Sequence, residues 1–262
     1  MKRLLPAVVA IASFVASPAF AADTSSAAAS HDWNSCYFGT NVGAETLSRS
    51  GSVDVPAATG AGGASPASSF PLIKQSDVPV AVGGQFGCSY QIVNYVFGLE
   101  GDADYHDFSI RQGIVSTPPP LFVAGDTFSV SSNWEGSIRG RAGIVRGPSL
   151  MYLTAGVAWT TLRVDTDFIA VGVFPADVIS VRKTVWGPTV GLGWEYPLWD
   201  NLNLAVEGRY SWYGSQRYNS GQLATFTNAG AFTFAPATTR TNLNAMAVTV
   251  RLNWQLDWAP WR

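Results

Sequence analysis

Apolar and polar residues alternate one by one along most of this chain. In one segment Leu153, Ala155 and Val157 share one parity, whereas Thr154 and Gly156 share the other. A period of two is that of a β-strand with one apolar and one polar face. The same pattern recurs at 36–43, 80–90, 95–105, 134–144, 153–160, 186–196, 203–212 and 246–254. The sequence therefore predicts eight strands, and no helix is expected in the mature chain.

The connections between these strands alternate in length. Short ones are expected near residues 91–94, 146–149 and 197–201. Long ones, rich in Ser, Gly, Ala, Pro and Thr, are expected at roughly 45–79, 106–131, 165–182 and 214–243. An even number of strands with short turns on one side and long loops on the other is typical of outer-membrane barrels. The predicted fold is all-β: an eight-stranded antiparallel transmembrane up-and-down β-barrel with short periplasmic turns and long extracellular loops.

The N-terminus has the features of an export signal. Lys2 and Arg3 precede an apolar run, and Ala19-Phe20-Ala21 forms an A-x-A cleavage site. We expect a signal peptide over 1–21, a flexible lead over 22–32, the barrel over 33–258 and a short tail over 259–262. No later run is long and apolar enough for a membrane helix, which needs about 20 residues.

Composition narrows the class of protein. Charged residues make up 13% of the 262 residues, against roughly 25% in typical globular domains. The aromatic content of 13% argues against a disordered chain. The formal net charge of −2 argues against a basic nucleic-acid-binding protein.

The polar face of the strands decides which kind of barrel this is, because a soluble barrel points its apolar face inward. Only Lys74 and Lys183 remain after signal cleavage, whereas arginines and carboxylates occupy strand centres. This balance favours ion pairs inside a narrow membrane barrel. The expected interior network comprises Glu100, Asp102, Glu135, Arg139, Arg141, Glu195, Glu207, Arg209 and Arg251. Glu135 is expected to pair with Arg139 or Arg141, and Glu207 with Arg209 or Arg251.

These charges could instead line a pore or a proton path. Eight strands leave an interior just wide enough for side chains to fill, which favours a stabilising network. Unpaired buried charges are costly, so each is expected to have a partner.

The apolar face carries aromatic residues near the strand ends. Transmembrane barrels place such aromatic girdles at both membrane interfaces. The expected girdle residues are Phe38, Tyr90, Tyr95, Tyr105, Trp134, Trp159, Trp186, Tyr196, Trp212 and Trp254. A protein-binding strip is the alternative, but the regular alternation on every strand favours contact with lipid.

Six segments in matching order resemble one family. They are Gly83–Gln91, Val96–Asp102, Trp134–Gly143, Tyr152–Ala158, Gly187–Glu195 and Val206–Gly214. Together they are similar to the small outer-membrane proteins of rhizobia and brucellae, also called OmpA-like or outer-membrane immunogenic proteins. The resemblance implies an eight-stranded outer-membrane barrel with structural and surface-antigen roles, and some relatives are described as porins or haemin binders. Such barrels usually end on an aromatic residue that the insertion machinery reads, whereas this chain runs on through 255–262, with alternation to Trp258.

Candidate chemistry is sparse. Cys36 and Cys88 share the apolar-face parity near the short-turn end, and an exported chain permits a disulfide, with two free buried thiols as the alternative. No metal-ligand spacing or cofactor motif is present, so no metal and no cofactor are expected. A Ser–His pair needs hydrogen-bond contact and an orienting acid. His106, at the start of an expected loop, has Ser109 and Asp107 nearby in sequence, which is weak support for a catalytic triad. The support for haem ligation by His106 or Tyr105 is equally weak. A solvated loop histidine is the simpler interpretation, so no enzyme is predicted.

Two functions remain. The first is a non-enzymatic outer-membrane barrel that maintains the envelope and displays loops, with 45–79 and 214–243 as surface determinants. The second is a small-solute porin or a barrel that binds haemin or a host surface. The expected partners are outer-membrane lipid, lipopolysaccharide and, during biogenesis, the insertion machinery. The sequence leaves the oligomeric state open.

Overall fold

The computed structural model describes residues 31–60, 63–113, 127–168, 177–226 and 232–256. Within them, regular structure consists of strands alone, and no helix there is long and apolar enough to cross a membrane. The strands are β1 (Ser35–Val55), β2 (Ala58–Gly60), β3 (Gly63–Ser65), β4 (Ser68–Asp77), β5 (Val80–Ile92), β6 (Tyr95–Gly113), β7 (Thr127–Arg146), β8 (Ser149–Phe168), β9 (Asp177–Trp199), β10 (Leu202–Phe226) and β11 (Phe232–Gln255). The expected signal peptide 1–21, most of the lead 22–32 and the tail 259–262 lie outside the described residues.

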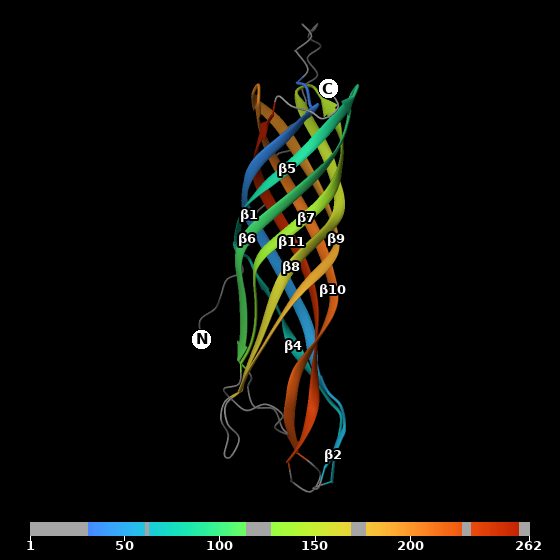
Figure 1. Cartoon of the computed structure of the whole chain (residues 1–262), viewed down its shortest axis with the longest axis vertical. Coiled ribbons are helices and arrows are strands. Elements are labelled where there is room, and N and C mark those ends of the chain that lie inside the picture. The colour runs from blue at the N-terminus through green and yellow to red at the C-terminus, as the bar shows by residue number, and fades with distance from the viewer. Residues whose placement is uncertain (1–30, 61–62, 114–126, 169–176, 227–231, 257–262) are drawn as a thin grey trace, which may run out of the picture.

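Eight strands form a closed antiparallel ring. The order is β1, β5, β6, β7, β8, β9, β10 and β11, and β11 pairs back onto β1. Sequential neighbours pair as hairpins, so the strands wind around a common axis (Figure 1). The predicted all-β antiparallel fold with a ring of eight strands is confirmed.

Tight turns join the strands at one end of the ring, at the top of Figure 1. The β5–β6 turn holds Val93 at a φ of 55°, and the β7–β8 turn holds Gly147 at 59°. Both turns coincide with short connections expected from the sequence. At the other end, β2 and β3 form a small separate hairpin, and β4 adds to the edge of β1.

The strands are much longer than the sequence pattern predicted. β10 has 25 residues and β11 has 24, whereas about 9–11 residues suffice for a strand to cross the bilayer core. Most of the segments 45–79, 106–131, 165–182 and 214–243, predicted as long loops, are strands in the described residues. β11 ends at Gln255, and Trp258, to which the alternation extends, lies outside the described residues.

These strand extensions were not predicted because the apolar and polar faces of the strands exchange places along the ring. On β8, Tyr152 and Thr154 point inward beside outward Leu153, but further along Leu162 is buried and Arg163 is exposed. The extended part of the ring thus has an apolar inside and a polar outside, the arrangement of a water-soluble barrel. A single orientation of the two faces throughout predicts loops for the reversed part, and this prediction is wrong.

Three layers of side chains fill the ring. Trp33, Val96, Leu150 and Tyr152 form an apolar cluster at the short-turn end. Charged side chains occupy the middle. Beyond them, away from the short turns, lies a second apolar cluster, here called the distal cluster: Leu47, Phe108, Ile110, Phe128, Val130, Ala158, Leu162, Val164, Val185, Tyr213, Tyr218, Leu243 and Ala245.

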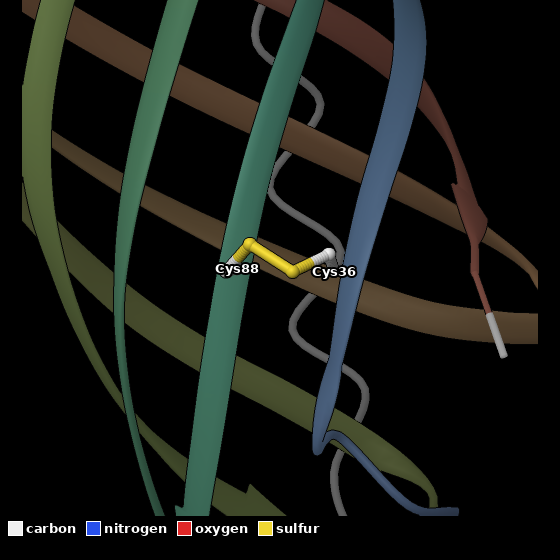
Figure 2. The surroundings of a disulfide bond; sticks show 2 residues. All are labelled: Cys36 and Cys88. Atoms are coloured by element: carbon white, nitrogen blue, oxygen red, sulfur yellow. A yellow bond between two sulfur atoms is a disulfide. The ribbon is translucent and has the colours of Figure 1, made fainter. Parts of the chain in front are cut away.

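A disulfide links Cys36 and Cys88, as predicted. The two residues are direct partners in the β1–β5 ladder, with Cα atoms 3.9 Å apart. Figure 2 shows the bond spanning these neighbouring strands. It lies near the start of β1 and so fastens the short-turn end of the ring.

Candidate functional site

The charged middle layer is the candidate site. All nine residues of the expected network point into the ring, and none is more than 7% exposed. Asp104 joins them from β6, and Glu45 from β1. Alternation explains this placement, because residues of one parity on neighbouring strands meet on the same side of the sheet.

Arg139 is the most connected of these side chains. Its Nη2 donates to Glu100 at 2.7 Å and to Asp102 at 2.8 Å, and its Nη1 donates to Glu207. Arg251 contacts two of the same carboxylates, Glu207 at 2.7 Å and Glu100 at 2.8 Å. One carboxylate therefore serves more than one guanidinium, which is how a buried network satisfies several charges at once.

Two further arginines extend the network toward both ends. Arg209 donates to Asp102 at 2.7 Å, Asp104 at 3.1 Å and Glu135 at 2.7 Å. Toward the short turns, Arg141 pairs with Glu195 and its guanidinium carbon lies 3.7 Å from the centroid of the Tyr152 ring.

One expected pairing is wrong. Glu135 pairs with Arg209 and not with Arg139 or Arg141. The strands tilt and the side chains cross the interior, so a partner comes from across the ring and not from the same strand. Glu207 does pair with Arg251, one of its two expected partners.

The network also contains neutral side chains that the sequence pattern did not predict. The Tyr37 hydroxyl donates to Glu100, and the Tyr152 hydroxyl donates to Glu207 at 3.0 Å. Both tyrosines were assigned no polar role. Tyr37 has the inward parity of β1, opposite to that of Phe38, and this parity is the signal that could have identified it.

A second series of contacting polar side chains lies between the network and the distal cluster. His106 Nδ1 is 2.9 Å from a Glu45 oxygen, and His106 Nε2 is 3.2 Å from the Ser132 hydroxyl. Ser132 in turn lies 2.7 Å from the Thr160 hydroxyl. His106 is thus a fully buried strand residue, and its interpretation as a solvated loop histidine is wrong.

The order serine, histidine and carboxylate is that of a hydrolase triad. Here, however, Ser132 is 1% exposed and both His106 and Glu45 are 0% exposed. A nucleophile needs access to its substrate, so this arrangement orders the interior but offers no open catalytic surface. Tyr105, the neighbour of His106, is 41% exposed and points outward, so the two residues lie on opposite faces of the sheet. Within the described residues, no cluster of three potential metal ligands occurs.

The outer face carries the expected aromatic residues in two belts. The belt near the short turns contains Phe38, Tyr90, Tyr95, Tyr196 and Trp254, and the opposite belt contains Tyr105, Trp134, Trp159, Trp186 and Trp212. Within the second belt, the rings of Tyr105 and Trp134 lie 5.3 Å apart and those of Trp159 and Trp186 lie 5.0 Å apart.

The separation of the belts follows from strand geometry. Tyr95 and Tyr105 are ten residues apart on β6. At about 3.4 Å per residue and a tilt of about 40°, this spacing spans roughly 26 Å. Large apolar side chains between the belts are exposed, among them Leu99, Ile138 and Leu153 at 62–68%. This band matches the apolar height of a membrane barrel.

The sequence model of one family, described as the outer membrane protein beta-barrel domain, matches residues 7–255. This chain belongs to that outer-membrane β-barrel family. Its location is accordingly the outer membrane of a Gram-negative bacterium.

Relatives of the barrel include named outer-membrane proteins. It is 31% identical over 133 residues to the 25 kDa outer-membrane immunogenic protein of Brucella abortus, across 51% of this chain and 52% of that protein. It is 31% identical over 139 residues to the 22 kDa outer membrane protein of Rhizobium leguminosarum, across 52% and 55%. The chain thus spans about half the length of the curated relatives it matches.

Solved structures similar to the barrel include OprG from Pseudomonas aeruginosa, at 11% identity and a TM-score of 0.46 over 87% of this chain and 99% of that one. Another is the outer membrane protease OmpT from Escherichia coli, at 12% identity and a TM-score of 0.45 over 84% and 97%.

Proposed function

We propose that this protein is a non-conducting, non-enzymatic barrel that supports the outer membrane and presents a long extracellular extension. The observation that carries the proposal is the filled interior. Buried arginines and carboxylates bridge the ring, and apolar clusters lie on both sides of them. An ion that crossed the barrel would have to displace all three layers.

The alternative is a small-solute porin. Its interior would hold water beside the charged side chains, whereas Arg139 is 1% exposed and Glu207 is 2% exposed. The enzymatic alternative needs an accessible nucleophile, and the Ser132 hydroxyl is buried. The structural function therefore has the stronger support.

Conductance in planar bilayers tests the proposal. Purified, heat-modifiable protein should give no steady channels, and neither should the Arg163→Met variant of the outer wall. Steady wild-type channels whose conductance changes in Glu135→Gln or Arg139→Met would establish a pore and refute the proposal. In cells, deletion should make the envelope permeable to dyes, and plasmid-borne protein should restore the barrier.

We also propose that lipopolysaccharide contacts the outer wall just beyond the second aromatic belt. A groove of about 460 Å³ lies there beside Trp134, lined by Arg163, Arg182 and Thr161 and also by Asp165, which pairs with Arg163 at 3.0 Å. Arginines and hydroxyls at headgroup level suit the phosphates of a glycolipid. Arg182→Ala should weaken binding of purified lipopolysaccharide to the protein in nanodiscs, whereas Arg146→Ala near the short turns should not. Equal binding by both variants would exclude this groove.

A further inference from the structure

Arg49 occupies an unusual position for a charged side chain. It lies on the inner face of β1 and is 0% exposed. Leu47 and Leu243, two of its neighbours, belong to the apolar distal cluster, and its guanidinium carbon is 5.0 Å from the centroid of the Phe128 ring. Its direct ladder partners are Leu243 on β11 and Gln75 on β4.

Among the side chains that the structure describes, the guanidinium of Arg49 has no hydrogen-bond partner. Its Nε, Nη1 and Nη2 atoms are all buried and unpaired among the residues that the structure describes. Each of the other four buried arginines, 139, 141, 209 and 251, donates to at least two side chains. Burial lowers the pKa of Arg49 to about 10. A buried cation without a counter-ion is costly, so this position calls for an anion.

Other donors near Arg49 are also unpaired. The hydroxyls of Tyr218 on β10 and Thr241 on β11 are buried and have no partner within the described part of the chain. Thr241 is the inner-face residue next to Leu243 and lies opposite Gly51 of β1. The Lys183 ammonium is 5.5 Å from the centroid of the Tyr218 ring. This part of the interior therefore combines the buried Arg49 cation with hydroxyl donors, and Lys183 itself is exposed.

A seam in the wall lies next to Arg49. β1 pairs with β5 as far as Ala44 and then, from Leu47 onward, with β4. β5 pairs with β6 only as far as His106, beyond which the described part of β6 pairs with β7 alone. β4 lies beside β6 without a ladder between them. The two strands can therefore separate without breaking ladder hydrogen bonds, at a level just beyond Tyr105 of the aromatic belt.

We propose that Arg49 binds the headgroup of a single-chain anionic amphiphile that enters from the outer leaflet through the seam between β4 and β6. A carboxylate or phosphate headgroup can accept two parallel hydrogen bonds from the guanidinium fork. The Thr241 and Tyr218 hydroxyls supply further donors. Leu47 and Leu243 near Arg49 suit an apolar tail. Because the distal cluster is already packed, only a slender tail fits.

Equilibrium binding to protein in phosphatidylcholine nanodiscs tests the site. The probes are dodecanoate, dodecyl phosphate and the neutral dodecan-1-ol, each corrected for uptake by empty nanodiscs. Wild-type protein should bind one of the two anions saturably, and the better one identifies the headgroup. Dodecan-1-ol should bind at least tenfold more weakly, because hydrogen bonds to a charged group are the strong ones. Equal uptake of alcohol and anions would overturn the proposal.

Arg49→Met provides the decisive comparison, with exposed Arg240→Met on the neighbouring β11 as the matched control. Anion binding should fall at least tenfold in Arg49→Met and stay unchanged in Arg240→Met. The Arg49→Met barrel should remain heat-modifiable and, without amphiphile, at least as resistant to urea as wild type. Unchanged anion affinity in Arg49→Met would refute the site. Lower urea resistance without amphiphile would also refute it, because it would indicate a structural partner for Arg49.

Discussion

Replacing Arg139 by Met tests whether the charged layer holds the barrel together. Breaking a buried ion pair from one side costs about 3–5 kcal/mol, because it leaves an uncompensated charge. Arg139 contacts three carboxylates, but each retains another arginine: Glu100 and Glu207 keep Arg251, and Asp102 keeps Arg209. We therefore expect a loss of about 3–5 kcal/mol and not three times that amount.

The assay is urea unfolding of the barrel in lipid vesicles, followed by tryptophan fluorescence and by gel mobility without boiling. Arg163→Met is the control, because Arg163 is 47% exposed in its ion pair with Asp165 and should contribute less than about 1 kcal/mol. Adding Glu207→Gln to Arg139→Met should cost less than the sum of the single changes, by about 0.5–3 kcal/mol. If Arg139→Met unfolds at the same urea concentration as the control, the interior is hydrated and the reasoning fails.

Three further predictions concern other parts of the wall. Replacing both Cys36 and Cys88 by Ser should lower the free energy of unfolding by about 2–4 kcal/mol, and dithiothreitol should destabilise wild type equally but leave the variant unchanged. Gly136→Ala should cost about 1–3 kcal/mol in the same urea assay, because the added methyl would collide with the Trp159 ring, whereas Gly140→Ala, with nothing nearer than 3.7 Å, should change little. The hydrogen bond from Ser69 lowers the pKa of Asp54, so its support of the β1–β4 ladder should be present above about pH 4 and lost as pH falls through the depressed value. NMR signals of β4 amides should report that loss in wild type and show no such transition in Asp54→Asn.

The sequence was sufficient for the membrane-spanning half of the molecule. Between the belts, alternation has one meaning, so the inward direction of Arg139 and the outward direction of Leu153 followed from parity alone. The partners of each charge did not follow, because Arg209 reaches Glu135 across the ring and such a contact depends on tilt and stagger. A local pattern carries no information about either.

The half of the ring beyond the second aromatic belt was predicted as loops for a different reason. Phe128 and Val130 alternate with Ser129 and Ser131 as regularly as any membrane segment, but the apolar residues point inward. A bulge between Ser132 and Glu135 shifts the parity of β7 at this level. The solvent outside changes from lipid to water there, and with it the side on which apolar residues are stable. Arg49 was missed with this half, since an arginine in an expected loop raises no question of pairing.

The Cys36–Cys88 bond has a consequence for how the molecule withstands proteolysis at the cell surface. It joins residues 52 positions apart, and the stretch between them includes the distal β2–β3 hairpin and β4. A single cut in that stretch would therefore leave both fragments covalently attached, and the nicked chain would separate into two pieces on a gel only after reduction. The protein can thus be clipped at its most distant tip without shedding its first strand from the membrane.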